Sequence, residues 1–485
     1  MTLPGRSEVN QPTAFRGFMS GRDAPGLVVL RGQKEIPTGT LVSPLLSLHR
    51  KQCQGKLEGD GAMVQQFPRV RAWSASIALA LLVIAVGCSR VTPHLELPHL
   101  QTRQPAFAAT LGGYSGTPVV PGNRVEILLN GQEIFPAKLT AIRSARRTIN
   151  YAQYVFEDGK PAEEISAALA ERCRAGVQVN VLLDAVGALA MPAQLRSDMT
   201  EAGCRVETFR PLRPFTIDRF NYRNHRRILV VDGVLGVTGG SGISGKWSGN
   251  GKQAGHWRDT DVRIEGPVVE QLQGAFAENW LEATGVAIGG PAHFPRRRLD
   301  SKGDVDAQVV RSSPAGGSSA MYTVFLLALA SAQQSIHITN PYFVPDEKMT
   351  SALLDATQRG VKVKLLIPGA IDHNLVRQAS RSAFGRLLKG GVLIYEYRPA
   401  LLHAKTMVID GIWATVGSTN LDHRSFALNE ELNVVVYDSD VAARLEEVFQ
   451  QDLANSQQVT YGDWSQRSLV SRFLEVLSLP LREQM

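Results

Sequence analysis

The sequence predicts an α/β fold made of two similar halves. In each half a helix leads into a strand, a second helix follows, and a glycine precedes a strand rich in Val, Leu and Ile. Strands that alternate with helices of about 10–15 residues indicate crossover units on a largely parallel sheet. A histidine, a cation and an Asp-Gly pair then recur at the same point of each half. We therefore expect two pseudo-symmetric lobes, each a mixed, largely parallel sheet flanked by helices, with an active site at the lobe interface.

The repeated elements can be placed by their hydrophobic period and by their glycines. In the first half, the helix-to-strand segment is 139–149, the next helix 162–174 and the next strand 177–183. The corresponding segments of the second half are 325–336, 348–359 and 361–367. The offset between equivalent points is 187 from Ile149 to Ile336 and 178 from His225 to His403, so small insertions distinguish the halves.

Composition divides the rest of the chain. We expect a doubtful leader over 1–62, a signal peptide or membrane anchor over 63–87, and a Pro-rich tether over 88–122 that is too broken for a helix. The two lobes, 123–288 and 320–485, are expected on either side of a polar linker at 289–319 that is rich in Gly and Pro.

The segment before the tether has the layout of a secretory signal. Its 18 residues 72–89 are uncharged, with an apolar centre at 77–86 that follows two arginines and ends just before Cys88. It resembles a bacterial lipoprotein signal, in which Cys88 would be lipidated and become the mature N-terminus. An uncleaved anchor is one alternative, because this length is at the lower limit for a spanning helix, and a soluble chain is another. We expect translation to start at Met63 and the body to be membrane-associated, in a bacterial cell envelope.

Composition also excludes several classes of protein. Of the 485 residues, 44% are apolar and 20% charged, which is unlike a disordered, collagenous or small disulfide-stapled protein. The four cysteines form no pair at zinc spacing, which argues against a structural metal. The formal charge is +7, but residues 1–87 hold 10 of the 52 Lys and Arg and 5 of the 45 Asp and Glu. The remainder is nearly neutral, so bulk charge does not indicate a nucleic-acid partner.

The recurring motif carries the chemistry. His225 and His403 each stand two residues before a cation, Arg227 or Lys405, and seven before an Asp-Gly turn, at Asp232 and Asp410 in that order. Positions i and i+2 of a strand face the same side, so each histidine and its cation should point together. The two aspartates belong to the candidate catalytic motif, but their odd spacing predicts that they fix the hairpin or pair with a basic residue instead of touching their own lobe's histidine.

Two such histidines suit phosphoryl chemistry. A neutral imidazole is a nucleophile or base near neutral pH, and a fixed cation beside it can hold a phosphate for attack. One histidine on a strand is weak evidence, whereas two at matching points of a repeat can flank a single phosphate. One would attack the phosphorus and the other would protonate the leaving oxygen.

The motif resembles that of a known family. The order His403, Lys405, Asp410, followed by Gly417-Ser418 and Asn420, is similar to the HKD signature of the phospholipase D superfamily. Segments 257–266, 340–345 and 417–433 resemble bacterial cardiolipin synthases, and the resemblance runs from about residue 123 to the C-terminus.

The resemblance implies a mechanism and further site residues. One histidine would form a phosphohistidine and the other would act as acid and base. Ser418 and Asn420, with Ser241 in the first lobe, would bind phosphate oxygens, and no metal or other cofactor is required. Glu431 is expected to orient His403, and Asp259 to orient His225.

The first lobe departs from the family pattern in two places. Arg227 replaces the lysine, and Gly242 replaces an asparagine. Arginine keeps the charge, although its planar fork is not equivalent to an ammonium group. We expect activity to survive with an altered rate or substrate preference, and an attenuated first lobe is the alternative.

Two smaller signals remain open. Cys173 and Cys204 could form a disulfide in an exported protein, and two free buried thiols are the alternative. Segment 464–481 has apolar residues at helical spacing, which predicts a helix packed on the body or, as the alternative, one that dips into a bilayer.

Taken together, these features predict a membrane-associated, monomeric phosphatidyltransferase of cardiolipin synthase type. Its partners would be a membrane and phospholipid substrates such as phosphatidylglycerol, with no nucleic acid. A phospholipase D hydrolase that releases phosphatidic acid is the main alternative. A nuclease, or a lipid-binding protein with an attenuated first lobe, is the weaker one.

Overall fold

The computed structural model describes residues 95–212, 221–295, 300–372 and 374–478. The expected leader, signal or anchor, and Cys88 lie outside these residues. Within the described ranges, no helix is both long enough and apolar enough to cross a membrane.

A single sheet of fifteen strands runs through the described part of the chain. Its order is β17-β12-β11-β10-β14-β15-β16-β9-β1-β8-β6-β5-β2-β3-β4. Outward from the antiparallel β1–β9 pair, the two halves repeat the same succession of strands, and β17 is added at one edge. The outer strands β2, β3 and β4 are parallel, as are β10, β11 and β12, whereas the inner strands are antiparallel. The expected α/β class with mixed sheets flanked by helices is confirmed.

The first lobe contains most of the elements that the sequence predicts. Its strands are β1 (Val120–Leu129), β2 (Thr148–Gln153), β3 (Gln178–Asp184), β4 (Arg205–Phe209), β5 (Ile228–Val231), β6 (Leu235–Gly239) and β8 (Thr260–Glu265). Its helices are α3 (Asn130–Ser144), α4 (Lys160–Arg174), α5 (Ala193–Glu201), the short η2 (Gly245–Trp247) and α6 (Val269–Thr284). A disulfide joins Cys173 of α4 to Cys204 at the start of β4, with 5.6 Å between their Cα atoms.

The second lobe repeats this plan. Its strands are β9 (Val305–Ser312), β10 (Ser335–Thr339), β11 (Lys362–Pro368), β12 (Leu393–Tyr397), β14 (Thr406–Ile409), β15 (Trp413–Gly417), β16 (Glu431–Tyr437) and β17 (Ser456–Val459). Its helices are the short η3 (Pro314–Gly316), α7 (Ala320–Ser331), α8 (Glu347–Gln358), α9 (Asn374–Lys389), α10 (His423–Ala427), α11 (Ser439–Leu453), α12 (Tyr461–Ser465) and α13 (Leu469–Ser478). A separate two-stranded sheet, β7 (Trp257–Arg258) with β13 (Leu401–Leu402), joins the lobes.

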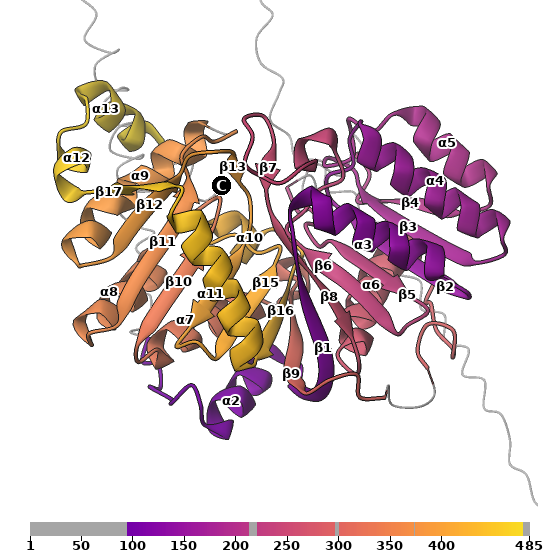
Figure 1. Cartoon of the computed structure of the whole chain (residues 1–485), viewed down its shortest axis with the longest axis horizontal. Coiled ribbons are helices and arrows are strands. Elements are labelled where there is room, and N and C mark those ends of the chain that lie inside the picture. Colours follow the sequence, from indigo (N-terminus) through magenta and orange to yellow (C-terminus); the bar gives the residue numbers. More distant parts are fainter. Residues whose placement is uncertain (1–94, 213–220, 296–299, 373, 479–485) are drawn as a thin grey trace, which may run out of the picture. The chain divides into compact units, whose positions relative to one another are not determined.

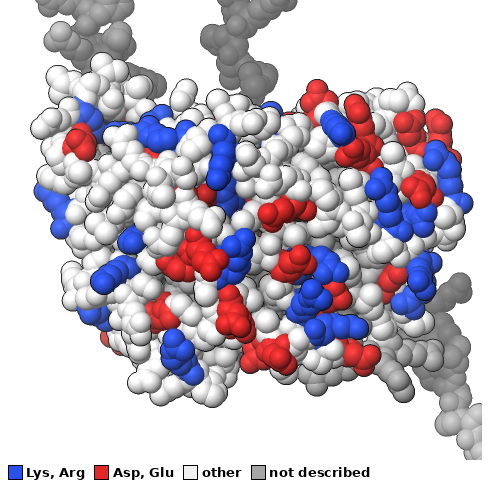
Figure 2. All heavy atoms as spheres, viewed as in Figure 1, with Lys and Arg blue, Asp and Glu red and all other residues white. Residues whose placement is uncertain are grey.

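Helices cover both faces of the large sheet. In Figure 1, α3 and α4 lie in front of the first lobe, whereas α11 lies in front of the second. Figure 2 shows charges of both signs scattered over this same face, as expected for a nearly neutral body.

Two expected boundaries differ from the structure. The expected tether contains the helix α2 (Pro105–Ser115), whose Phe107 and Leu111 are fully buried against α7. Its proline stands in the first turn, where a missing N–H costs nothing, and Gly116 ends the helix in the left-handed conformation. The expected linker contains β9, because its Gly and Pro residues flank a short strand whose four central residues are all buried.

The C-terminal helix also differs from the preferred expectation. Helix α13 does contact α9, but Leu469, Val470, Phe473, Leu474 and Val476 are exposed instead of packed on the body.

Candidate active site

Both histidines lie where the two lobes meet, beyond the carboxyl ends of the parallel strands. His225 precedes β5 and His403 follows β13. The backbone N–H of His225 donates to the carbonyl of Glu430 at 2.9 Å, and that of His403 donates to the carbonyl of Arg258 at 2.7 Å. Each histidine is therefore tied to a segment of the opposite lobe.

The acids that hold the histidines are exchanged relative to the expectation. Nδ1 of His225 donates to Glu431 at 2.9 Å, and Nδ1 of His403 donates to Asp259 at 2.7 Å. The predicted pairing of Glu431 with His403 and of Asp259 with His225 is therefore wrong, although each acid does contact a histidine.

Strand register across the lobes explains the exchange. In the parallel β7–β13 pair, Leu402 lies opposite Arg258, so the next residues, His403 and Asp259, meet. A parallel bridge between Asn224 and Glu430 brings His225 beside Glu431 in the same way.

The two acids differ in their environment. Burial raises the pKa of Glu431 to about 7, although Ser418 and Ser425 donate hydrogen bonds to it at 2.5 and 2.8 Å. Burial alone would also raise the pKa of Asp259. The charges of His403 and Lys405, together with a 2.8 Å hydrogen bond from the Trp247 indole, hold it below its usual range. His403 therefore faces an ionised carboxylate.

Each cation lies beside its own histidine, as expected. The Arg227 guanidinium is 3.0 Å from Nε2 of His225, and the Lys405 ammonium is 2.9 Å from Nε2 of His403. Because Nδ1 carries the proton toward the acid, the free lone pair of each ring is on Nε2. Nε2 of each ring thus lies beside a basic side chain.

Burial and these cations shift the pKa values of the bases. Burial, together with the charge of Lys405, lowers the pKa of His403 to about 4. Burial and Arg227 lower the pKa of His225 well below its ordinary value. Burial lowers the pKa of Lys405 to about 7. At neutral pH both imidazoles are uncharged in the empty site, so both can act as nucleophile or base.

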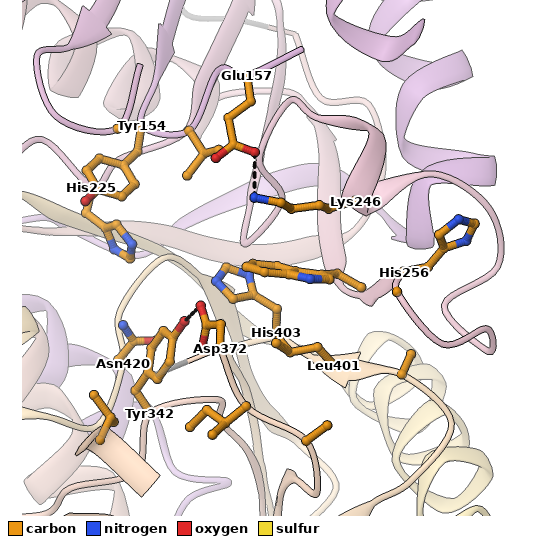
Figure 3. Close-up of a pocket in the computed structure, with 18 of the residues that line it drawn as sticks. Tyr154, Glu157, His225, Lys246, His256, Tyr342, Asp372, Leu401, His403 and Asn420 are labelled. Atoms are coloured by element: carbon orange, nitrogen blue, oxygen red, sulfur yellow. Dashed lines mark hydrogen bonds and ion pairs between the residues drawn. The ribbon is translucent and has the colours of Figure 1, made fainter. Parts of the chain in front are cut away.

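The two imidazoles line one cavity of about 950 Å³. Figure 3 shows both rings near the centre of the view, with Tyr342 and Asn420 below them and the ion pair of Lys246 with Glu157 above them. Aromatic rings flank both histidines: Tyr154 is 4.8 Å from His225 between ring centroids, and Trp257 is 4.9 Å from His403. Aromatic and aliphatic side chains thus share the walls with charged ones of both signs.

The expected phosphate-binding residues are only partly brought together. Asn420 lines the pocket, and its Oδ1 has no hydrogen-bond partner among the described residues. The Ser418 hydroxyl instead donates to Glu431. Ser241 is fully buried, donates to Asp261 at 2.6 Å, and accepts from Lys138 at 2.8 Å. A direct contact of Ser241 with a substrate phosphate is contradicted, because its hydroxyl is consumed in this buried network.

Asp232 and Asp410 serve the backbone, as their spacing predicts. The Asp232 carboxylate accepts the backbone N–H groups of residues 146–148 at 2.7–2.9 Å. Asp410 does the same for residues 333–335 at 2.7–3.1 Å. Each aspartate has positive φ in the turn between two paired strands. They are thus not catalytic in the sense of touching the reacting atoms.

Trp247 is the functional residue that the sequence reasoning missed. Its indole donates to Asp259 and packs at 5.4 Å from the His403 ring. A Cβ at Gly242 would lie 2.6 Å from the Trp247 ring, so the lost asparagine makes room for this tryptophan. Ser425 holds Glu431 from the matching position of the second lobe. Aligning the two halves of the sequence pairs Gly242 with Asn420 and Trp247 with Ser425. This pairing could have revealed Trp247.

Comparisons with known proteins agree with this geometry. The family model described as "Cardiolipin synthase, PLD-like domain" matches residues 139–280 and 325–453. The chain is 36% identical to cardiolipin synthase 2 of Bacillus anthracis over 72% of this chain and 68% of that protein. It is 35% identical to cardiolipin synthase A of Pseudomonas syringae, over 78% of each chain. The crystal structure of phosphatidylserine synthase from Haemophilus influenzae has a similar fold. It superposes with a TM-score of 0.62 at 13% identity and covers 78% of this chain and 100% of that one.

Proposed function

The chain belongs to the phospholipase D superfamily and, within it, to the cardiolipin synthase family, and from that premise we propose that it transfers a phosphatidyl group from one phospholipid to the hydroxyl group of another. The observation that carries the proposal is the facing pair of histidines in one pocket, each with Nδ1 held by an acid and Nε2 beside a cation. Phosphatidylglycerol is the proposed donor and acceptor.

The proposed reaction has two balanced halves. Nε2 of one histidine attacks the phosphorus, so a P–N bond forms as the P–O bond to the leaving alcohol breaks, and the other imidazolium protonates that oxygen. In the second half, the neutral imidazole takes the proton of an acceptor hydroxyl, whose oxygen attacks the phosphorus, so a P–O bond forms as the P–N bond breaks and the first histidine is released.

Fixed charges would support both halves. Arg227 and Lys405 offset the charge on the non-bridging phosphate oxygens, and the amide oxygen of Asn420, which has no partner among the described residues, can accept a hydrogen bond from the acceptor hydroxyl. An anionic phosphate between the rings favours the protonated form of the second histidine, which raises its low pKa on binding.

Incubating the purified full chain with headgroup-labelled phosphatidylglycerol, and resolving the products, tests the function. Cardiolipin with free glycerol supports the transferase, and phosphatidic acid with free glycerol and no cardiolipin would assign the enzyme to the hydrolases. H225A and H403A should each lower turnover by about 10²–10⁴-fold. H337A is the matched control, because His337 is a buried histidine outside the pocket that pairs with Glu446. Full turnover in H403A would contradict the mechanism.

We further propose that the body is held at a membrane of a bacterial cell envelope, through a lipid on Cys88 or an anchor within 63–87. The signal layout supports this, and the residues concerned lie outside the described part of the chain. Mass spectrometry of the mature protein is the test: an unmodified N-terminus upstream of residue 88 would contradict lipidation.

A further inference from the structure

Two polar residues of helix α13, Glu475 and Ser478, are turned toward the body. Glu475 is buried and accepts from the Arg467 guanidinium at 2.8 Å, and Ser478 is fully buried. A surface helix of a soluble domain has the opposite arrangement, with its apolar side on the core.

Five apolar side chains of this helix face away from the body. Leu469, Val470, Phe473 and Val476 are between 61% and 78% exposed, and Leu474 is 42% exposed. Contiguous exposed apolar side chains of this kind mark a surface that is covered by another apolar body.

The support beneath α13 fixes it to α9. The Trp464 indole donates to the carbonyl of Arg381 at 3.0 Å, and its ring packs on Gly385, where a Cβ would lie 2.2 Å away. The Arg467 guanidinium lies 3.6 Å above the same ring. The apolar face of α13 is therefore held outward by specific contacts on α9.

Helix α13 lies at the pocket end of the molecule. In Figure 1 it is at the top, as are β7 and β13, whose residues Trp257 and Leu401 line the pocket. The supporting helix α9 begins at the pocket rim, where Val376 lines the cavity. In the other lobe, Leu189 is 68% exposed in the loop whose Gly187 also lines the pocket.

We propose that the exposed face of α13 inserts into the interfacial layer of a lipid bilayer and thereby presents the pocket mouth to lipid substrates. This inference rests on the proposed function, which requires a two-chain substrate to leave a bilayer. Charge favours this occupant, because Arg472 is exposed on α13 whereas its one acidic residue, Glu475, is buried and paired. An apolar face with an exposed cation is typical of helices that bind anionic lipid surfaces.

Hydrogen exchange of the full-length protein, with and without vesicles of phosphatidylglycerol and phosphatidylethanolamine, tests the docking directly. Amides of Leu469–Ser478 should exchange at least about tenfold more slowly with vesicles, whereas those of α2 should not change, because α2 lies at the opposite end of the molecule (Figure 1). Equal exchange in both conditions would overturn the proposal. So would protection that depends on protein concentration without lipid, which would assign this face to a second copy of the chain. If these amides exchanged equally slowly with and without vesicles, another segment of the chain, such as 72–89, would be assigned as the cover of this face.

A matched pair of variants ties the docking to catalysis. F473D should abolish the vesicle-dependent protection and lower turnover on vesicles by about tenfold or more, the cost of losing one buried aromatic side chain. Y114D on α2 should change neither, since Tyr114 is 62% exposed and Phe473 63%. Both variants should keep wild-type turnover of a monomeric short-chain phosphatidylglycerol. Loss of that turnover in F473D would overturn the proposal. Absence of turnover in the wild type would contradict the proposed function. The hydrogen-exchange measurement would still show whether α13 docks on vesicles.

Discussion

At the scale of single residues, the two halves of the site are chemically unequal. His403 faces the ionised Asp259, whereas His225 faces Glu431, whose pKa is raised to about 7 by burial. The cations also differ, because Lys405 has its pKa lowered to about 7 and Arg227 is a guanidinium. Burial also raises the pKa of Asp422, which lines the pocket, to about 7, so Lys405, Glu431 and Asp422 all titrate near neutral pH.

This inequality predicts a bell-shaped pH profile of kcat/KM centred near pH 7. Below about 7, Glu431 is protonated and orients His225 poorly. Above about 7, Lys405 loses the charge that holds phosphate. K405R should remove the alkaline limb and keep the acid limb, because a guanidinium stays charged throughout this range.

The profile is measured with a monomeric lipid analogue between pH 5 and 9. K389R, at an exposed lysine of α9, is the control and should leave both limbs in place. If the alkaline limb of K405R stayed at the pH of the wild-type limb, a group other than Lys405 would be its cause.

Gly242 and Trp247 form a second residue-scale test. The G242N side chain would collide with the Trp247 ring, which is pinned to Asp259, so we expect a loss of about 1–3 kcal/mol in the free energy of unfolding. Replacing the tryptophan as well, as in G242N/W247S, reproduces the Asn420 and Ser425 pair of the second lobe and should recover part of the loss. Urea denaturation of the wild type, both single variants and the double variant measures the coupling. Additive effects would contradict the contact.

At the scale of elements, the local pieces could be predicted from the sequence and the cross-lobe pairing could not. The crossover helices, their strands and the Asp-Gly turns follow from hydrophobic period and turn chemistry within short segments. The exchange of Glu431 and Asp259 depends on the register of β7 with β13 and of Asn224 with Glu430, which are long-range contacts. Helix α2 is not evident from the sequence because its segment is rich in prolines, although none of them lies in the interior of the helix.

The exchanged pairing predicts which histidine responds to each acid. D259N should shift the ring nitrogen resonances of His403 and leave those of His225 near their original positions, and E431Q should do the reverse. Spectra of protein labelled with ¹⁵N in its histidines, assigned through H225A and H403A, make the measurement. If the substitution of each acid shifted the resonances of the histidine in its own lobe more than those of the histidine in the other lobe, the cross-lobe strand register would be contradicted.

At the scale of the whole molecule, the lobes share one sheet through the β1–β9 pair and share the site through β7–β13. Both lobes lie in a single compact unit. An interface of paired strands and buried ion pairs couples the stability of the two halves more tightly than a flexible linker would.

We therefore expect one cooperative unfolding transition. Tryptophan fluorescence and far-UV circular dichroism should give the same urea midpoint, because Trp280 and Trp413 are fully buried in different lobes. An inactive H403A protein is the control and should unfold at a similar midpoint in one step. Two separate midpoints would show that the lobes unfold independently.

The exchanged acids also restrict how such a chain could have arisen. A single lobe contains one of the two pocket histidines and the carboxylate that holds the histidine of the other lobe, so by itself it is half of the site. Two identical copies related by a twofold axis would complete each other. Association of two copies must therefore have accompanied the chemistry, and duplication with fusion into one polypeptide would then have freed the copies to diverge, as Arg227 against Lys405 and Trp247 against Ser425 have done.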